Sequence, residues 1–420
     1  NILSLTFTNK AAREMKNRIS QLVGEGNSRA LWMGTFHSVF AKILRYEAEK
    51  IGYPSNFTIY DSDDSKSLIR TIIKEMNLDD KVYKPQLVQR RISSAKNGLI
   101  SGTEYQNDTI IHNDDLQAKK PLLGKIYGTY EKRCFKASAM DFDDLLYKTN
   151  ILLKNHSDVL LKYQDKFKYI LVDEFQDTNF AQSNILKMLA ARHENICVVG
   201  DDAQSIYAFR GANIQNILQF KSLYPDAAVF KLEQNYRSTK TIVAAANQVI
   251  DNNKEQLKKD VWTSNQKGDS LKLIKCLSES EEGAFIASEI LDTKDNDNAS
   301  EDDFAILYRT NAQSRALEEA LRRKNIKYRI YGGLSFYQRK EIKDLLAYFK
   351  LCSNPNDEEA FKRVLNYPAR GIGKTTESKI MMAASEEGKS PLAIVNNVNE
   401  AHLPINAATK NRILEFAHII

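Results

Sequence analysis

The chain has 420 residues, of which 42% are hydrophobic and 27% charged, and its mean hydropathy is -0.46. These values predict a soluble globular protein with more than one domain; no apolar run approaches the roughly 20 residues of a membrane span, and Asn1 begins an apolar run rather than a signal peptide. The net charge of +6 permits a polyanionic partner without requiring one, and four scattered cysteines without a CxxC pair indicate a cytoplasmic protein with neither a zinc site nor disulfides.

Short apolar runs that end in polar residues predict the strands of the first half of the chain. They lie at residues 2–7, 169–172, 196–199 and 228–232. Continuous runs of this kind are typical of strands buried on both faces. Helical patterns separate them, at residues 11–23, 181–192 and 214–223. This alternation predicts a parallel, doubly wound α/β sheet, which binds ligands at the carboxyl ends of its strands, where the polar residues lie.

Two further regions have patterns of their own. Residues 62–136 are polar, helix-prone and rich in Lys and Arg, and we expect a helical insertion there. After residue 235 a second alternation predicts strands at 271–274, 304–308 and 328–331, and helices at 282–291 and 312–324. The acidic stretch 292–303 is expected to be a surface loop. From residue 344 onward the pattern is helical again.

Two adjacent carboxylates, Asp173 and Glu174, end one of the predicted strands in the segment ILVDEFQDT. In nucleotide hydrolases the first acid at such a place helps to hold Mg²⁺, and the second can polarise the attacking water. Taken alone, the pair could equally be two solvated acids at a strand end. The segment is therefore a candidate catalytic motif whose context has to decide its meaning.

The next strand is followed by GDDAQSIYAFRGA, residues 200–212. Gln204 could sense a γ-phosphate, and Arg210 could neutralise developing charge. Tyr207 and Phe209 could stack on bases, as in proteins that bind single strands without sequence preference. The alternative for both rings is an ordinary place in the core.

A third segment, LEQNYRST at residues 232–239, follows the last of these strands. Arg237 could act as an arginine finger on a transferring phosphoryl group, and Tyr236 could stack on a nucleobase. A surface salt bridge is the alternative for Arg237.

Together, in this order and at this spacing, the three segments resemble motifs II, III and IV of the UvrD/Rep family of superfamily 1 helicases. Further matches follow the family's order. TFTNKAAREM at residues 6–15 looks like motif Ia, and GTFHS at 34–38 looks like the next DNA-contacting motif. YGGLSFYQRKEIKD at 331–344 resembles the motif that closes the first part of the second motor domain. The six matches cover residues 1–350.

The resemblance implies an α/β fold with two RecA-like P-loop NTPase motor domains, each with a parallel sheet and a mostly helical inserted subdomain. We expect the first motor in residues 1–61 and 137–232, with its insertion at 62–136. The second motor is expected at 233–343, with its insertion at 344–420. ATP would bind in the cleft between the two motors.

Carried over residue by residue, the resemblance implies the following roles. Asp173 would bind Mg²⁺ and Glu174 would activate water. Gln204 would couple the γ-phosphate to DNA contacts, Arg237 and Arg210 would stabilise the transition state, and Tyr236 would stack on adenine. The single-strand path would be lined by Phe7, Asn9, Thr35, His37, Tyr207 and Phe209. Outside its motif, His37 would more often be a structural histidine.

The sequence departs from the family pattern in two respects. Phe209 stands where many members have Trp, which leaves less surface for stacking. The family's Walker A motif should precede Asn1, and motifs V and VI should follow Ile420. This segment alone is therefore expected to bind ATP and Mg²⁺ weakly or not at all, because the Walker A loop holds the β- and γ-phosphates.

A second GKT segment needs its own interpretation. Gly373, Lys374 and Thr375 look like the end of a Walker A motif, but Pro368 stands where the pattern requires Gly, and no buried strand leads into it. The loop instead resembles one in the family's second helical insertion. There Gly371, Gly373 and Lys374 would approach a duplex phosphate backbone. The alternative is an ordinary helix-start loop.

The function implied is that of an ATP-dependent 3′ to 5′ DNA helicase in repair or replication. Its partners would be single-stranded DNA, single-/double-strand junctions and repair or replication proteins, with no membrane. Two alternatives stay open. This polypeptide could be a DNA-binding module without ATPase activity, or the motor portion of a helicase–nuclease.

Overall fold

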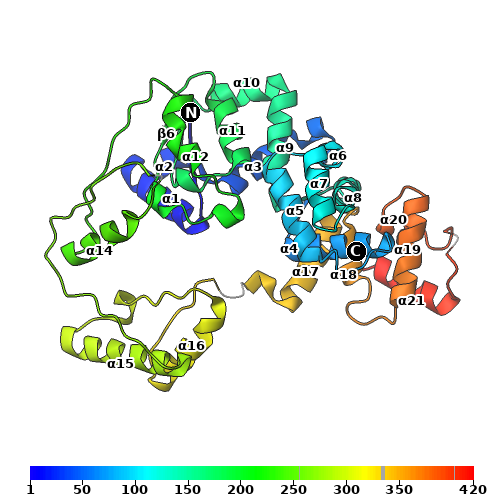
Figure 1. The fold of residues 1–420 in the computed structure, drawn as a ribbon. Helices are drawn as coiled ribbons and strands as arrows, with labels where there is room; N and C mark the ends of the chain where they lie inside the picture. Colours follow the sequence, from blue (N-terminus) through cyan, green and yellow to red (C-terminus); the bar gives the residue numbers. More distant parts are fainter. Residues whose placement is uncertain (255, 333–335, 402) are drawn as a thin grey trace. The chain divides into compact units, whose positions relative to one another are not determined.

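The computed structural model describes residues 1–254, 256–332, 336–401 and 403–420 (Figure 1). The chain forms two compact units. Unit 1 comprises Asn1–Lys231, Asn253–Lys259 and Leu346–Ile420, and unit 2 comprises Leu232–Asn252 and Asp260–Leu345. Each unit is described by itself.

A four-stranded parallel sheet lies at the centre of unit 1. Its order is β2 (Trp32–Thr35), β1 (Ile2–Thr6), β5 (Tyr169–Val172) and β6 (Ile196–Val198). Leu5 pairs with Gly34 on one side and with Val172 on the other, and Val172 pairs with Val198. The predicted strands at 2–7, 169–172 and 196–199 are thus confirmed, and all four carboxyl ends meet at one edge of the sheet.

Burial of the sheet differs between its strands. One face packs into a core that includes Leu3, Leu5, Ile170 and Val172, together with helices α3 (Phe36–Glu47), α9 (Phe142–Asn155), α10 (Ser157–Lys166) and α11 (Phe180–Ala190). On the outer side of β5, Leu171 is 39% exposed and Tyr169 52%. The expectation of strands buried on both faces is therefore wrong for β5, and also for β6, where Cys197 is exposed, because the described helices leave these alternate side chains uncovered.

The other helices of this region are short or exposed. Thr8 caps α1 (Asn9–Val23), which has no buried residue and touches the sheet through Met15, whose sulfur lies 3.2 Å from Ser4 Oγ. The remaining ones are α2 (Glu25–Arg29), α12 (Gln215–Leu218) and α13 (Phe220–Leu223). Of the helices expected at 11–23, 181–192 and 214–223, the first two are found as α1 and α11, and the third is divided into the short helices α12 and α13.

The expected helices at 62–136 are also present. They are α4 (Ser62–Glu75), α5 (Pro85–Asn97), α6 (Gly102–Asn107), α7 (Thr109–Gln117) and α8 (Leu123–Lys136). Two parallel strands that the patterns did not indicate flank them, β3 (Thr58–Tyr60) and β4 (Ala139–Asp141). Each strand runs into the same D-x-D-D sequence, in which Asp61 caps α4 and Asp141 caps α9 through capping boxes.

The last part of unit 1 is helical, as expected. It contains the end of α17 (Lys340–Ser353), then α18 (Glu358–Val364), α19 (Lys374–Glu386), α20 (Pro391–Asn396) and α21 (Ala407–Ala417). Buried Asn354 joins it to the strands beside the insertion: its Nδ2 donates to Thr58 Oγ1 at 2.9 Å and to the carbonyl oxygens of Ala137 and Ser138 at 3.0 and 3.1 Å.

Unit 2 contains α14 (Lys240–Ile250), α15 (Glu279–Asp297) and α16 (Ser314–Arg323). The last two lie side by side (Figure 1). Gly283 allows their close approach, since a Cβ there would lie 2.9 Å from the Ala316 carbonyl oxygen. The surface loop expected at 292–303 is wrong in its first half, because residues 292–297 contain neither Gly nor Pro and continue α15. The left-handed backbone of Asn298 then ends the helix.

The strands expected at 228–232, 271–274, 304–308 and 328–331 do not form. Among the described residues of unit 2, the one bridge is a parallel pair between Gln234 and Trp262. A strand requires neighbours that accept and donate its backbone hydrogen bonds, and these segments have none in the described residues. Phe304 and Ile306 pack against the core between α15 and α16, but other apolar side chains of these segments stay in solvent, with Leu273 100% and Leu307 94% exposed.

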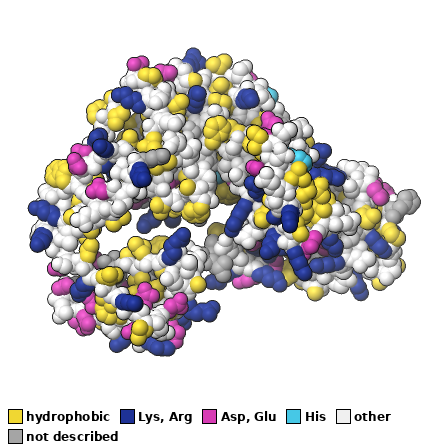
Figure 2. All heavy atoms as spheres, viewed as in Figure 1, with side chains coloured by type: hydrophobic (Ala, Val, Ile, Leu, Met, Phe, Trp, Pro, Cys, Tyr) yellow, Lys and Arg dark blue, Asp and Glu magenta, His cyan; other side chains and the backbone are white. Residues whose placement is uncertain are grey.

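Charge is mixed on the face drawn in Figure 2, where Lys and Arg side chains are scattered among Asp and Glu. In the part of the chain that the structure describes, no helix has both the length and the apolar composition to cross a bilayer.

Candidate nucleotide and nucleic-acid site

The predicted acids follow directly from β5 at the carboxyl edge of the sheet. The backbone N–H of Asp173 still donates to the Leu5 carbonyl oxygen at 2.9 Å, which ties it to the central strand. The chain then turns sharply, because Glu174 has a left-handed backbone with φ of 54°. A non-glycine residue in that conformation is uncommon and indicates a constrained turn. The turn directs two carboxylates away from the sheet, where Asp173 is exposed and Glu174 half-buried.

Gln176, which the sequence did not single out, connects the acid pair to the neighbouring strand end. Its Nε2 donates to Glu174 Oε2 at 2.8 Å, and its Oε1 accepts from the backbone N–H of Asp201 at 3.0 Å. The side chain is 1% exposed. Gly200 makes room for it, since a Cβ there would lie 2.6 Å from Gln176 Oε1. The side-chain amide of Gln176 therefore connects the acid motif to the motif that begins at Gly200.

The carboxylates of this edge perturb one another. Burial and the charge of Glu174 raise the pKa of Asp173, and the same two causes raise the pKa of Asp177 to about 6. Asp177 is buried, and its Oδ1 has no hydrogen-bond partner among the described residues. A bound cation would relieve such a cluster of negative charge. Within the described residues, no group of three or more acids, histidines or cysteines could hold a metal by itself.

The second motif is anchored by a lysine from a distant segment. Lys259 Nζ forms ion pairs with Asp201 and, at 2.8 Å, with Asp202. Burial raises the pKa of Asp201, but Lys259 and the Gln204 amide outweigh this and lower it overall. Gln204 is exposed and donates to Asp201 Oδ2 at 2.8 Å. Nothing in the sequence around Lys259 indicates this role, because the pair spans 57 residues.

Three predicted stacking residues form a row of rings. Phe7, which follows β1, lies 5.2 Å from Tyr207 between ring centroids, and Tyr207 lies 6.0 Å from Phe209. Phe209 is 79% exposed. The structure thus brings together aromatic residues from two motifs some 200 residues apart, and it does not bury Phe209 in the core. Asn9 is exposed at the first position of α1.

The GTFHS segment ends β2 and begins α3. Buried Thr35 caps the helix, since its Oγ1 accepts from the Ser38 N–H at 3.3 Å. The His37 ring lies 4.9 Å from the ring of Phe142, which sequence analysis did not single out. Burial lowers the pKa of His37 to about 4, so the imidazole is neutral at pH 7 and offers a ring face rather than a positive charge.

A hydrogen-bonded chain joins the acid motif to the helical insertion. Asn179 caps α11 and its Nδ2 donates to Asn97 Oδ1 at 2.7 Å. Asn97 in turn donates to Asp143 Oδ1 at 3.1 Å. The turn that carries Phe142 is therefore linked to the segment that carries Glu174. No local pattern marks Asn97, which reaches Asn179 across 82 residues.

Two predicted nucleotide ligands lie in unit 2. Tyr236 is 78% exposed, and its hydroxyl donates to Gln234 Oε1 at 2.8 Å. Arg237 is exposed, and its backbone N–H donates to Asn235 Oδ1 at 2.9 Å in a turn before α14. The side chain of Arg210 and part of the motif at 331–344 lie outside the described residues.

The loop before α19 is shaped by its own side chains. Asn366 Oδ1 accepts from the backbone N–H groups of Arg370 and Ile372 at 2.8 and 3.1 Å. Gly371 has φ of 69°, and Gly373 caps the helix without a side-chain hydrogen bond. Helix α19 therefore begins at exposed Lys374 with uncapped N–H groups, an arrangement that favours an anion.

Comparison with known proteins defines the class. Residues 1–225 match the UvrD/REP helicase N-terminal domain, and residues 230–406 match the UvrD-like helicase C-terminal domain. The chain belongs to the UvrD/Rep helicase family, whose fold contains two RecA-like motor domains.

Its curated relatives include several proteins described as ATP-dependent DNA helicase PcrA. It is 44% identical to that of Bacillus subtilis (strain 168) over 420 residues, which is 100% of this chain and 56% of the relative. Identity to that of Staphylococcus aureus (strain NCTC 8325 / PS 47) is 45% over 390 residues, 93% of this chain and 52% of the relative. Identity to the protein of Leuconostoc citreum is 41%, over 100% of this chain and 55% of the relative. The chain spans about half the length of these relatives.

Proposed function

We propose that the whole protein is an ATP-dependent DNA helicase that translocates 3′ to 5′ on single-stranded DNA. Asp173 would hold Mg²⁺, and Glu174 would take a proton from the attacking water. Gln204, Arg210 and Arg237 would respond to the γ-phosphate, and Tyr236 would stack on adenine. Its substrates would be single strands and single-/double-strand junctions in repair or replication, in the cytoplasm.

The observation that carries this proposal is the double hydrogen bond of Gln176. The amide contacts the proposed base, Glu174, and the backbone of Asp201, which begins the segment that carries Tyr207 and Phe209. If Glu174 moved on phosphate release, Gln176 would transmit the movement to the backbone of Asp201 and so to the segment that carries Tyr207 and Phe209. A contiguous hydrogen-bonded network of this kind can carry energetic coupling between two sites when it has two arrangements.

The DNA path proposed for unit 1 follows the exposed rings. Phe209, Tyr207 and Phe7 would stack on successive bases, and Asn9, Thr35 and His37 would continue the path. Base stacking on aromatic side chains tolerates any sequence, as a translocating motor requires. On the duplex side, the uncapped start of α19 with Gly371, Gly373 and Lys374 would receive a phosphate.

The residues present fit ATP with Mg²⁺ in their donor chemistry. Mg²⁺ prefers oxygen ligands and is commonly bound by one or two carboxylates with waters and phosphates, and Asp173 offers an exposed carboxylate of raised pKa. Bound Mg²⁺ would neutralise charge on the phosphates. No Walker A pattern occurs in residues 1–420, so we propose that this segment alone hydrolyses ATP poorly and could act as a DNA-binding module. The motor portion of a helicase–nuclease is the other alternative.

The test compares ATP hydrolysis, with and without single-stranded DNA, for this segment and for a longer protein that includes a Walker A motif. We expect DNA-stimulated hydrolysis in the longer protein alone. Glu174→Gln in it should lower turnover by about 10²–10⁴-fold, the usual contribution of a general base, while single-strand affinity stays unchanged. Full turnover in Glu174→Gln would contradict the role of Glu174. A folded longer protein that binds DNA without hydrolysis would favour the binding module.

A further inference from the structure

A groove of about 1040 Å³ lies beside strand β2 in unit 1. It is lined by residues 31–33, by α1 and α2 on one side and by the first turns of α3 on the other. The two sides belong to opposite faces of the sheet, because Ser4 of β1 contacts Met15 of α1, whereas Leu3 packs into the core that contains α3. The groove is as large as the largest small-ligand sites, which leaves room for several residues of an extended chain.

Strand β2 is the outermost strand of its sheet. It pairs with β1 on one side, and within the described residues no strand pairs with its other side. The outer edge of such a strand presents N–H and C=O groups to which an extended chain can bind. Edge strands are commonly protected by their own charged or proline residues, but Trp32–Thr35 has the sequence WMGT, which contains neither. The edge of β2 can therefore accept a further strand.

The groove has cations on both of its sides. Lys16 and Arg29 line it from α1 and α2, and Lys42 lines it from α3, whereas Glu25 is the one carboxylate in its described lining. Arg29 and Glu25 lie 3.6 Å apart, but both side chains are 82% exposed, so solvent screens this pair. The groove is therefore positively charged and favours an anionic ligand.

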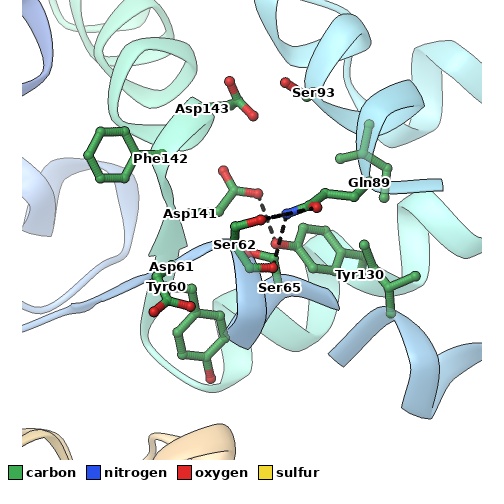
Figure 3. Close-up of a pocket in the computed structure, with 12 residues that line it drawn as sticks. Tyr60, Asp61, Ser62, Ser65, Gln89, Ser93, Tyr130, Asp141, Phe142 and Asp143 are labelled. Carbon is green, nitrogen blue, oxygen red and sulfur yellow. Dashed lines mark hydrogen bonds between the residues drawn. The ribbon is translucent and has the colours of Figure 1, made fainter. Parts of the chain in front are cut away.

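The cavity drawn in Figure 3 has the opposite charge. It has a volume of about 320 Å³ and lies between the helical insertion and the turn that begins α9. Its lining includes Asp61, Asp141 and Asp143 and contains no Lys or Arg. The positive charge of the groove beside β2 is therefore a local property and does not simply follow from the net charge of the chain.

Trp32 lies at the centre of the positive charge. It lines the groove, and Lys42 Nζ and Lys166 Nζ each lie 4.3 Å from the centre of its ring. Burial and the charges of Lys162 and Lys42 lower the pKa of Lys166. Lys162 pairs with Glu47 at 2.5 Å, whereas neither Lys42 nor Lys166 has an ion-pair partner among the described residues. A carboxylate beside Trp32 would relieve the repulsion among these lysines.

We propose that the groove binds an extended acidic segment of a partner protein, which adds as a further strand to the outer edge of β2. Successive side chains of a strand point to opposite faces of the sheet. Because each side of the groove has its own cations, consecutive Glu or Asp residues of the segment would find partners on both sides. A nucleic acid would satisfy the charge but lacks the N–H and C=O groups that pair with a strand edge. The proposal does not rest on the helicase function proposed above.

The test uses the fluorescence of Trp32. The chain contains two tryptophans, so Trp262→Phe leaves Trp32 as the single reporter. The probe is a capped ten-residue peptide of Thr and Val with three consecutive Glu residues at its centre. We expect a saturable change in the emission of Trp32 and slower hydrogen exchange at residues 32–35. The same peptide with Gln in place of Glu should bind several-fold more weakly. The Glu peptide with N-methyl groups on alternate backbone nitrogens should not bind.

Matched variants separate the groove from the general charge of the surface. Lys42→Gln and Arg29→Gln should each weaken binding of the Glu peptide several-fold and make its salt dependence less steep, with little effect on the Gln peptide. Lys187, which is exposed on α11 and does not line the groove, provides the control. Lys187→Gln removes the same charge and should leave the affinity for the Glu peptide unchanged. Melting curves of each variant exclude misfolding.

Four outcomes would overturn the proposal. The first is a folded chain that does not bind the Glu peptide, and the second is equal affinity for the Glu, Gln and N-methylated peptides. The third is displacement of the Glu peptide by oligothymidine, which would assign the groove to nucleic acid. The fourth is a dimer, detected by sedimentation, that the peptide dissociates, because the edge of β2 would then be covered by a second copy of the chain.

Discussion

In unit 1 the predicted residues of the acid and aromatic motifs lie at the edge of a hydrogen-bonded parallel sheet. In unit 2 Tyr236 and Arg237 lie beside the one bridge of the described residues, between Gln234 and Trp262. The core that joins α15 and α16 of unit 2 consists of few buried residues: Ala287, Ile290, Ala320, Leu321 and Ile326. In unit 1, by contrast, distant segments meet through buried polar contacts such as those of Lys96, Gln176 and Asn354. Similar apolar runs thus form a sheet in unit 1 and irregular, partly exposed chain in unit 2, because a strand depends on its neighbours.

Removal of the buried cation of unit 1, Lys96, is expected to have the largest effect on stability. Lys96→Met would leave Asp141 and Asp144 buried without compensation. Loss of one partner from a buried ion pair typically costs about 3–5 kcal/mol, and we expect a fall of that size in the free energy of unfolding by urea. Burial disfavours the charged Lys96, but the two carboxylates outweigh it and raise its pKa well above the usual value.

Lys272→Met in unit 2 is the matched control. Lys272 pairs with Glu289 at 2.8 Å, but the two side chains are 72% and 44% exposed. Because solvent screens such pairs, this variant should leave the urea midpoint almost unchanged. Equal losses in the two variants would show that buried polar contacts do not distinguish unit 1 from unit 2.

The second prediction concerns the buried carboxylate of Asp177, which destabilises unit 1 when it is ionised. The folded state raises the pKa of Asp177 from 3.8 to about 6, so the folded protein binds this proton more tightly than the unfolded chain does. Proton binding at Asp177 therefore adds to the free energy of unfolding. This contribution is fully present below pH 3.8 and is lost as the pH rises through 6. Asp177→Asn should therefore raise the melting temperature at pH 8 by a few degrees, and the gain should shrink toward pH 4.

Asp165→Asn provides the control, because it removes an exposed carboxylate of the same unit. A gain for Asp177→Asn that is the same at pH 4 and pH 8 would mean that the raised pKa is not its cause. A gain in stability together with a loss of DNA-stimulated hydrolysis in the longer protein would indicate that Asp177 is kept for function at a cost in stability.

The elements that sequence reasoning predicted well are those with local signals. Strand β5 ends where its apolar run meets Asp173, and α1 begins one residue after its cap, Thr8. Phe7, Tyr207 and Phe209 were predicted only as separate stacking residues. The order of the motifs indicates these residues but does not predict that the rings of Phe7 and Tyr207 are in contact. Phe142 was not found, although its D-x-D-D context is repeated at residues 61–64.

The residues that sequence reasoning could not find act across long separations. Lys259 and Asn97 have ordinary neighbours in sequence, and their partners are set by packing alone. Gln176 lies within the acid motif, but its sequence position does not indicate its contact with the backbone of Asp201. The strands that were predicted but do not form have a different explanation. Residues 271–274 and 304–308 have the composition of strands, but composition cannot tell whether a neighbouring strand is there to pair with them.

The smallest expected effect concerns two glycines in the loop before α19. Gly371 has φ of 69°, and a Cβ there would lie 2.7 Å from Arg412 Nη1, which itself donates to the Gly371 carbonyl oxygen at 3.2 Å. Gly371→Ala should therefore lower stability by about 1 kcal/mol, the usual cost of a left-handed alanine. Gly373 has φ of −82° and nothing within 4 Å of its Cβ position, so Gly373→Ala should leave the urea midpoint unchanged.

The same pair of variants tests whether the loop touches DNA. A methyl group at residue 373 would stand in open space before the first N–H groups of α19, where a phosphate would approach. If the loop binds duplex DNA, Gly373→Ala should weaken duplex affinity by a few-fold at unchanged stability, and the salt dependence of binding should become less steep. If duplex affinity and its salt dependence stay the same, the loop is an ordinary helix start, and Gly371 is required only for its backbone conformation.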